Sequence, residues 1–549
     1  MSSPDPDGLQ HARAGGRPRQ REKTPPCSCG CPNGTDVRGW IGVIAQREKN
    51  GLSLDEAYVQ AWNKLTDVNP FPSVLGRICP HPCQDSCNRG PMDGSLEVRA
   101  LERFLGDKGL EMNLPLGRRE APPVVASIGI VGSGPAGLSC AYQLARRGHR
   151  VTVYERAPMA GGMLRYGIPD YRLPPAILDA EIERIVSLGV EIRVNTAVGR
   201  DVTVDAIHRS HDAIFVGIGA QLGQALRIPG EDGPGVWTGT DYLRAVNQGQ
   251  RADTGRRVIV VGGGNTAVDA CRTARRGGSD VVLLYRRGRD EMPAYADEVD
   301  AMIAEGVRVE FLTAPVAIQR SGARVTGVLA QLMKLGDVDE SGRRRPEPIQ
   351  GATFQIPADS VIAAVSQGPD WHDIESINPG GGWIDVDGSG AIAEDVWVGG
   401  DIRGLGFASL AIAQGRRAAE EIHARVCGLE VPPQRDPSDQ EGPPVNRDFY
   451  PPRRPPKPRE LPPTSALARP DAEVTATLLE EQFLAELDNC LSCGQCFGCQ
   501  HCWMYCSSGG FSRVVESEPG RYFTISLDSC ESCGKCVDVC PCGFLEFNA

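Results

Sequence analysis

VVASIGIVGSGPAG, residues 124–137, joins an apolar run rich in β-branched residues to a glycine-rich turn. Such a run predicts a buried parallel strand, and a helical pattern, LSCAYQLARRG, follows the turn. Gly132, Gly134 and Gly137 would allow a tight turn, close approach of the backbone to a pyrophosphate, and tight packing of helix on strand. The segment therefore predicts a dinucleotide-binding site.

An acidic residue follows at the expected distance. The next strand pattern, HRVTVYE, ends at Glu155, where a carboxylate can accept hydrogen bonds from the two hydroxyls of a ribose. A glycine motif alone is a weak signal, but strand, turn, helix, strand and acid in this order are specific. The alternative, a glycine-rich loop without a ligand, is disfavoured by this context.

A second unit repeats the pattern with a different ending. Residues 257–287 read RVIVVGGGNTAVDACRTARRGGSDVVLLYRR, with Gly262, Gly264 and Ala267 at the glycine positions. In place of the acid stand Arg286 and Arg287. A guanidinium binds the 2′-phosphate that a carboxylate would repel, so this unit predicts NADP rather than NAD. The alternative is solvated charge at a strand end.

The first site ends in a carboxylate and the second in two guanidinium groups, so the two sites are predicted to bind different dinucleotides. A flavin that receives hydride from a nicotinamide fits this arrangement, and such chemistry belongs to the cofactors. We therefore expect no catalytic acid, base or nucleophile among the side chains. A disulfide reductase would need a Cys-x-x-Cys pair beside the flavin, and there is no cysteine between Cys140 and Cys271.

The composition restricts the class of protein. The 549 residues predict three to four domains, and a net charge of −12 argues against a nucleic-acid-binding protein. No stretch approaches the roughly 18 apolar residues of a membrane span, and the first residues lack the apolar core of a signal peptide. We therefore expect a cytoplasmic location. Twenty cysteines in a cytoplasmic protein indicate metal binding or redox chemistry rather than disulfides.

Eleven of these cysteines lie in the last sixty residues. In the bacterial ferredoxin pattern C-x2-C-x2-C-x3-C-P, three thiolates hold one [4Fe-4S] cluster and the fourth binds the neighbouring cluster. Two runs predict two clusters, with a zinc ribbon or a disulfide framework as alternatives. The first run could also shift its register to use the spare Cys490 and Cys493. The expected ligands are Cys496, Cys499, Cys502 and Cys506, then Cys530, Cys533, Cys536 and Cys540.

Four further segments carry a resemblance to a known family. They are GGMLRYGIPDYRLP at 161–174, YRRGRDEMP at 285–293, VGGD at 398–401 and AIAQGR at 411–416. With them the chain resembles, over almost its whole length, the small subunit of glutamate synthase and related NADPH-dependent iron–sulfur flavoproteins. The resemblance implies FAD at the first site, NADPH at the second, and an FAD domain split by the NADPH domain. It adds Gly162, Arg165, Gly400 and Asp401 to the flavin site.

The resemblance also implies a helical iron–sulfur domain at the N-terminus. A [4Fe-4S] cluster near the flavin would be held by Cys31, Cys79, Cys83 and Glu102, and a second, more distal one would draw on Cys27 and Cys87. Leu75 stands where the family often has cysteine, and two upstream cysteines of many members are missing. Because a cubane normally needs four ligands, one N-terminal cluster is expected, the second is left open, and zinc is the alternative.

The expected fold class is α/β, with two Rossmann-like domains, an N-terminal helical iron–sulfur domain and a C-terminal ferredoxin-like α+β domain. A proline-dense stretch should form an extended, semi-rigid tether before the last domain. The expected divisions are a disordered tail 1–24, the helical domain 25–120, the FAD domain 121–255 and 375–427, the NAD(P)H domain 256–374, the linker 428–475 and the ferredoxin-like domain 476–549.

These features predict an NAD(P)H-dependent oxidoreductase that exchanges electrons with a ferredoxin or a partner oxidoreductase. A 2-oxoacid:ferredoxin oxidoreductase is one such partner that the resemblance implies. The alternatives are a small subunit of glutamate synthase and a noncatalytic electron-storage subunit.

Overall fold

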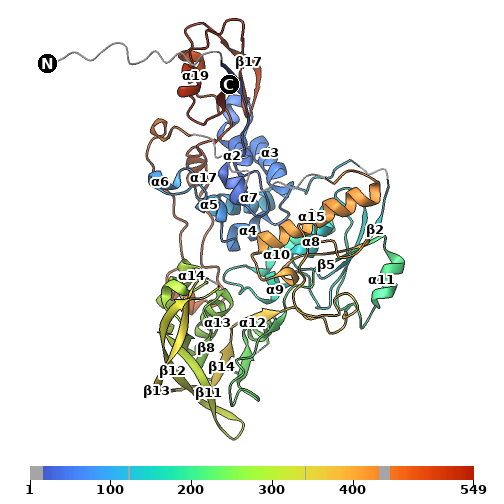
Figure 1. The fold of residues 1–549 in the computed structure, drawn as a ribbon, viewed down its shortest axis with the longest axis vertical. Coiled ribbons are helices and arrows are strands. Elements are labelled where there is room, and N and C mark those ends of the chain that lie inside the picture. The colour runs from blue at the N-terminus through green and yellow to red at the C-terminus, as the bar shows by residue number, and fades with distance from the viewer. Residues whose placement is uncertain (1–15, 121–123, 251, 341, 432–444, 549) are drawn as a thin grey trace, which may run out of the picture.

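The computed structural model describes residues 16–120, 124–250, 252–340, 342–431 and 445–548. Two α/β lobes lie below and beside a helical lobe, and the C-terminal segment sits on top of the helical lobe (Figure 1). This architecture confirms the predicted fold class. Within the described residues, no helix combines the length and apolarity needed to cross a membrane.

The first α/β domain is built on a parallel sheet with the strand order β16-β5-β2-β3-β4. Helices α8, α10 and α15 cover one face, where Ile128 and Ile130 of β2 are fully buried. Because β16 and α15 follow the second domain in the chain, this domain is made of two segments. The elements are β2 Ser127–Val131, α8 Pro135–Ala145, β3 Arg150–Tyr154, α9 Met163–Tyr166, α10 Pro175–Val186, β4 Glu191–Arg193, α11 Val204–Ser210, β5 Ala213–Val216, β16 Val396–Val398, η3 Asp401–Arg403 and α15 Ala408–Cys427.

The second α/β domain has a parallel sheet with the order β10-β9-β8-β14-β7, and an antiparallel sheet β11-β12-β13 packs beside it. The predicted boundary at residue 255 differs from the structure, since β7 (Val236–Thr238) already pairs with β14. This three-residue strand follows a Gly/Pro-rich segment and is too short for a periodic signal. The other elements are α12 Gly239–Asn247, β8 Arg257–Val261, α13 Asn265–Arg276, β9 Asp280–Tyr285, η2 Arg289–Glu291, α14 Ala296–Ala304, β10 Arg308–Phe311, β11 Thr313–Ser321, β12 Arg324–Val338, β13 Arg344–Pro357 and β14 Ser360–Ala363, with β6 Leu222–Gly223 and β15 Gln367–Gly368 paired at the crossing.

The helical domain packs directly against the first α/β domain. Glu181 of α10 is buried and accepts hydrogen bonds from the backbone N–H groups of Ser73 (2.7 Å) and Val74 (3.0 Å), in the first turn of α4. This contact satisfies two donors that the start of a helix leaves free. The elements are α1 Pro26–Gly30, α2 Val37–Ala45, η1 Arg47–Asn50, α3 Leu54–Thr66, α4 Pro72–Ile78, α5 Pro82–Asp85, α6 Gly90–Asp93 and α7 Val98–Glu111.

The proline-dense linker and the helix after it lie on the helical domain. Residues 432–444 are outside the described part, but Arg453 binds Glu486 at 2.9 Å and the carbonyls of Gly94 and Ser95. Phe483 is fully buried and stacks on Phe104, with ring centroids 4.0 Å apart. The described end of the linker is therefore docked rather than a free tether. The linker contains η4 Arg447–Phe449 and α16 Pro463–Ala468, and the helix after it is α17 Glu480–Leu487.

The two ends of the described chain pair with each other. Strand β1 (Arg17–Gln20) runs antiparallel to β19 (Leu545–Asn548), and Arg19 binds Glu546 at 2.5 Å. The predicted disordered tail over 1–24 therefore differs from the structure after residue 16, whereas residues 1–15 lie outside the described part. Because RPRQ has charged or amide side chains around a single proline, its own pattern gives no strand signal. The last domain also has α18 His501–Met504, β17 Phe511–Glu518, β18 Arg521–Ile525 and α19 Lys535–Asp538.

Candidate functional site

A cavity of about 350 Å³ lies at the carboxyl end of β2, where the glycine-rich turn enters α8. Gly132 has φ +97°, and a Cβ there would lie 2.6 Å from the carbonyl oxygen of Gly217. A Cβ at Gly137 would lie 2.0 Å from the carbonyl oxygen of Gly132. These glycines therefore permit the tight turn, and with Gly134 they leave the start of α8 open to a phosphate.

Glu155 lines the same cavity at the end of β3. One carboxylate oxygen accepts hydrogen bonds from the N–H (3.0 Å) and hydroxyl (2.5 Å) of Ser133, and the other accepts one from the N–H of Ala157 (2.8 Å). These donors fix the carboxylate, which keeps acceptor sites for a ribose hydroxyl pair. The geometry fits the role that the sequence predicts.

The residues added by the family resemblance separate into two groups. Gly162, Gly400 and Asp401 line the cavity, and a Cβ at Gly162 would lie 2.7 Å from the Cα of Gly134. Burial raises the pKa of Asp401 to about 6. Arg165 instead binds Asp179 and the carbonyl oxygen of Ala160, and it lines a neighbouring cavity. Its side chain holds the loop in place beside the site.

The second glycine turn has the same construction. Gly262 has φ +149°, and a Cβ there would lie 2.2 Å from the carbonyl oxygen of Ala364 and 3.2 Å from the Cβ of Ala267. A Cβ at Gly264 would meet no atom within 4 Å, so the backbone there is open to a ligand.

The two arginines after β9 have different surroundings. Arg287 is buried, binds Asp339 at 2.6 Å and donates to the carbonyl oxygen of Arg344 at 2.8 Å. Arg286 is exposed, and within the described residues its guanidinium makes no hydrogen bond or ion pair. Only Arg286 therefore has all its donors available for a 2′-phosphate.

A buried ion-pair network that the sequence did not predict joins the two α/β domains. Arg172, in the loop after α9, binds Asp269 of α13 at 2.7 Å and Glu298 of α14 at 3.2 Å. Tyr171 packs its ring 3.9 Å from the guanidinium of Arg276. The network fixes the orientation of one dinucleotide unit relative to the other.

The N-terminal residues predicted to hold a cluster near the flavin lie together. After burial, the charges of Cys31, Glu102 and Cys79 each raise the pKa of the Cys83 thiol. Burial raises the pKa of Glu102 to about 8 and that of Cys79 to about 12, with Glu102 adding to the latter. Four neighbouring acidic groups of this kind, with Cys83 buried and the other three partly buried, are suited to a bound cation, which would compensate their charge. Leu75 lies in the apolar core between the domains, one helical turn before Cys79, whose N–H donates to its carbonyl oxygen at 2.9 Å.

The cysteines of the last domain line two separate cavities, each of about 20 Å³. In both, three cysteines of one run meet the fourth cysteine of the other run. This is the grouping that the ferredoxin spacing predicts. Cys542, which the sequence analysis did not assign, also lines the first cavity, with its sulfur 3.9 Å from that of Cys540. The first cavity has Cys496, Cys499, Cys502 and Cys540, and the second has Cys506, Cys530, Cys533 and Cys536.

Cys27 and Cys87 are not part of the N-terminal group around Glu102. Both line a third small cavity, together with Cys490 and Cys493 from the segment before the ferredoxin-like domain. Neither Cys490 nor Cys493 lines the ferredoxin cavities. The alternative register that would use them in the first run is therefore not the one the structure adopts.

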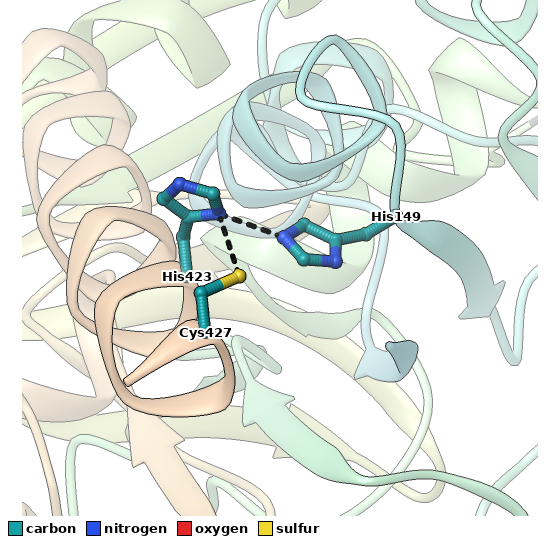
Figure 2. A group of neighbouring side chains, drawn as sticks. All are labelled: His149, His423 and Cys427. Atoms are coloured by element: carbon teal, nitrogen blue, oxygen red, sulfur yellow. Dashed lines mark hydrogen bonds between the residues drawn. The ribbon is translucent and has the colours of Figure 1, made fainter. Parts of the chain in front are cut away.

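Outside these groups, His149, His423 and Cys427 form a cluster with mutual distances that suit a metal ion (Figure 2). Nε2 of His149 lies 2.8 Å from Nδ1 of His423, and Nδ1 of His149 accepts a hydrogen bond from the N–H of Ala126 at 3.2 Å. Since Nδ1 is an acceptor, the ring proton of neutral His149 is on Nε2, which donates to His423. The pair is satisfied as a hydrogen bond between neutral rings.

Two Rossmann-like units facing one another, with several cysteine groups in one body, define an oxidoreductase of the two-dinucleotide class that carries iron–sulfur clusters. The family model of the pyridine nucleotide-disulphide oxidoreductases matches residues 126–415, which is 290 of 549 residues, and the chain belongs to this family. Despite the family name, no cysteine is among the described residues that line the first cavity.

Two further family models match the flanking domains. The model described as dihydropyrimidine dehydrogenase domain II, 4Fe-4S cluster, matches residues 19–114, and a 4Fe-4S dicluster domain matches residues 495–544. FAD and NADP(H) domains and [4Fe-4S] domains are thus combined in one chain, as predicted.

Three curated proteins illustrate the similarity. The chain is 40% identical to the NADP(+)-dependent formate dehydrogenase subunit beta of Moorella thermoacetica, over 73% of this chain and 59% of that protein. It is 40% identical to the NADPH-Fe(3+) oxidoreductase subunit beta of Geobacter sulfurreducens, over 63% of this chain and 51% of that protein. It is 32% identical to the glutamate synthase [NADPH] small chain of Escherichia coli, over 72% of this chain and 88% of that protein. The chain thus spans between half and two thirds of the first two relatives.

Proposed function

We propose that this chain is the NADPH-dependent electron-transfer subunit of a larger oxidoreductase. NADPH would reduce the flavin in the first cavity, and electrons would leave, or enter, through the iron–sulfur domains. One contact carries this proposal: the sulfur of Cys79 lies 3.8 Å from the hydroxyl of Ser409, in the first turn of α15. Ala411 of the same turn lines the flavin cavity. The N-terminal thiol group is thus separated from the cavity by a single helical turn.

The proposed roles of the side chains follow from their positions. Glu155 and the Gly132 turn would hold the flavin dinucleotide, with Gly162, Gly400 and Asp401 around it. Arg286 would hold the 2′-phosphate of NADPH at the second turn. The proposed cluster ligands near the flavin are Cys31, Cys79, Cys83 and Glu102, and those of the last domain are the two groups of four named above.

A bound flavin accepts a hydride and releases electrons one at a time, which is the conversion that cluster chains require. The contribution of the protein is orientation. Arg172 and Asp269 keep the two dinucleotide units in a fixed relation, and the absence of cysteine from the described cavity lining favours electron transfer to metal centres over disulfide reduction.

The partner is proposed at the level of chemistry, as a ferredoxin or a second oxidoreductase subunit that accepts single electrons. The names of the Moorella and Geobacter relatives, both subunits of oxidoreductases, support such an assembly. A 2-oxoacid:ferredoxin oxidoreductase remains one candidate, and the cytoplasmic location remains a prediction. The second candidate function, a small subunit of glutamate synthase, is supported by the Escherichia coli relative.

An anaerobic titration tests the proposal. NADPH should bleach the flavin absorbance of the purified holoprotein and then support reduction of a viologen dye, and NADH should do so less well. A holoprotein that does neither is not the proposed enzyme. Copurification with a large subunit that forms glutamate from NADPH would favour the second candidate.

A further inference from the structure

The third cysteine-lined cavity lies between two parts of the chain that are far apart in sequence. Cys27 and Cys87 come from the helical domain, and Cys490 and Cys493 come from the segment after α17. We propose that these four cysteines together hold an additional [4Fe-4S] cluster, ligated half by the helical domain and half by the tail. This proposal rests on the proposed function only for what the cluster would do, not for its existence.

Neither flanking domain contains this site by itself. The dicluster domain match begins at residue 495, after both tail cysteines, and the N-terminal match at 19–114 includes only the other two. Cys27 and Cys87 alone offer two ligands, which is why the sequence left a second N-terminal cluster open. The fold supplies the other two ligands from a distance of more than 400 residues in the chain.

The cavity resembles the two ferredoxin cavities. Its volume is about 30 Å³, against about 20 Å³ for each of those, and each of the three is lined by at least four cysteines. All four thiols are free. All four cysteines line this one small cavity, and Cys27, Cys87 and Cys490 also pack against the same apolar cluster.

The spacing of the thiols favours a cluster over a single metal ion. In a zinc site, bonds of about 2.3 Å bring the sulfurs to within about 4 Å of each other. In the described part of the chain, only His149, His423 and Cys427 form a group of three potential ligands with all mutual distances within 4.8 Å. No three of the four cysteine sulfurs therefore lie within 4.8 Å of one another, which is a wider spread than a mononuclear zinc site has.

The surroundings provide positive charge for a cluster with its thiolates. Arg38 and Arg89 both line the cavity and are almost fully buried. Arg38 donates to the carbonyl oxygen of Cys493 at 2.7 Å, while its Nε has no hydrogen-bond partner among the described residues. A buried cation beside four thiolates lowers the cost of their negative charge.

Polar donors also lie beside the sulfurs. The side-chain amide of Asn88 donates to the sulfur of Cys493 at 3.4 Å. The hydroxyls of Ser28, next to Cys27, and Ser492, between the two tail cysteines, are buried and have no partner in the described structure. Buried donors normally have partners, and the sulfurs of a cluster would provide acceptors for donors of this kind.

The two halves of the site are held together by packing. Arg89 donates to the carbonyl oxygen of Asn489 at 3.0 Å, directly before Cys490. The stacked rings of Phe104 and Phe483 fasten the preceding helix to the helical domain. The ligand set is therefore preorganised by contacts that do not involve the cysteines themselves.

The position of the cavity suggests what the cluster would do. Cys83 of the group near the flavin lies in the apolar cluster against which Cys27, Cys31, Cys87 and Cys490 also pack, so the cavity adjoins that group. Tyr450 donates a hydrogen bond to the carbonyl oxygen of Leu491, which lines this cavity, and its ring centroid lies 6.2 Å from that of Phe497, which lines the first ferredoxin cavity. If the proposed function is correct, this cluster would pass single electrons between the flavin side and the ferredoxin-like domain.

Iron content tests the site in the full-length protein. After anaerobic reconstitution with iron and sulfide, Cys490→Ser/Cys493→Ser should lose about four irons and about four sulfides per chain, the content of one cubane. Cys27→Ser/Cys87→Ser should show the same loss and lack the same EPR signal after dithionite reduction. Cys29→Ser is the matched control, because Cys29 lies on α1 beside Cys27 but does not line the cavity; it should keep wild-type iron.

The outcomes separate the two proposals. Unchanged iron in either double variant, loss of different EPR signals by the two pairs, or loss of one zinc per chain instead of iron would each overturn the shared cluster. Flavin content serves as the folding check and should stay at the wild-type level. If wild-type protein binds this iron but NADPH does not bleach its flavin, the proposed function fails while the shared site stands.

Discussion

Arg172 lies 2.8 and 2.7 Å from the two carboxylate oxygens of Asp269, and both side chains are almost fully buried. The arginine belongs to the loop after α9 beside the flavin cavity, and the aspartate belongs to the helix of the second glycine turn. The contact is thus a direct connection between the two dinucleotide units.

Arg172→Met should loosen this connection. Removing one partner of a buried ion pair leaves an uncompensated charge and costs about 3 kcal/mol or more. We expect faster hydrogen exchange in α13 and slower flavin reduction by NADPH. Arg256→Met is the control, because Arg256 and Asp280 form an exposed pair at 3.3 Å, and exposed pairs contribute about 0–1 kcal/mol. Equal effects of the two substitutions would contradict a role for the buried contact.

The two arginines after β9 should respond differently to substitution. Arg286→Ala should lower the ratio of kcat/KM for NADPH to that for NADH by about 10- to 100-fold, since a charged hydrogen bond contributes about 1.5–3 kcal/mol. Arg287→Ala should mainly lower thermal stability, because it removes the buried contact with Asp339. An unchanged coenzyme ratio in Arg286→Ala/Arg287→Ala would refute the NADP assignment.

The tail should depend on one aromatic anchor. Phe483→Ala removes a fully buried ring from the helical domain and should cost about 3–5 kcal/mol. We expect limited proteolysis to cut between residues 445 and 490, and hydrogen exchange to rise in α7. Leu479→Ala, at an exposed position directly before the same helix, should change neither. A tail that stays protected in Phe483→Ala would show that the linker contacts alone hold it.

Local patterns were enough to predict the dinucleotide units and the ferredoxin grouping. The turn at Gly132 and the cysteine runs are each formed by residues close together in the sequence, so the spacing of these residues is enough to predict their geometry. The fold class and the two-dinucleotide oxidoreductase class followed from these motifs, and the family matches confirm both.

Contacts between distant segments could not be predicted in the same way. The pairing of β1 with β19 uses a short strand, RPRQ, that has no alternating apolar pattern of its own. Arg287 and Arg286 are adjacent in sequence, yet only the fold shows that one of them is already bound. The sequence analysis assigned Cys490 and Cys493 to no cluster of their own, because the cysteines that line the same cavity, Cys27 and Cys87, lie in another domain.

The histidine pair in Figure 2 predicts a pH dependence of stability. Burial, reinforced by the charge of His423, lowers the pKa of His149 to about 4, and burial also lowers the pKa of His423. The unfolded chain binds protons on these rings below about pH 6.5, whereas the folded chain resists them, so stability falls as the pH falls from about 6.5 to 4.

Replacing one ring should reduce this loss. In His149→Gln, the decrease in unfolding free energy between pH 7 and 5 should be smaller than in wild type by up to about 2 kcal/mol. Thermal unfolding at both pH values, followed by flavin fluorescence, measures the difference. His372→Gln is the control, because His372 is exposed and its contact with Glu375 is 3.6 Å. Since acid also damages iron–sulfur clusters, only the difference between variant and wild type is informative, and identical pH slopes would mean that the buried rings are charged in the folded protein.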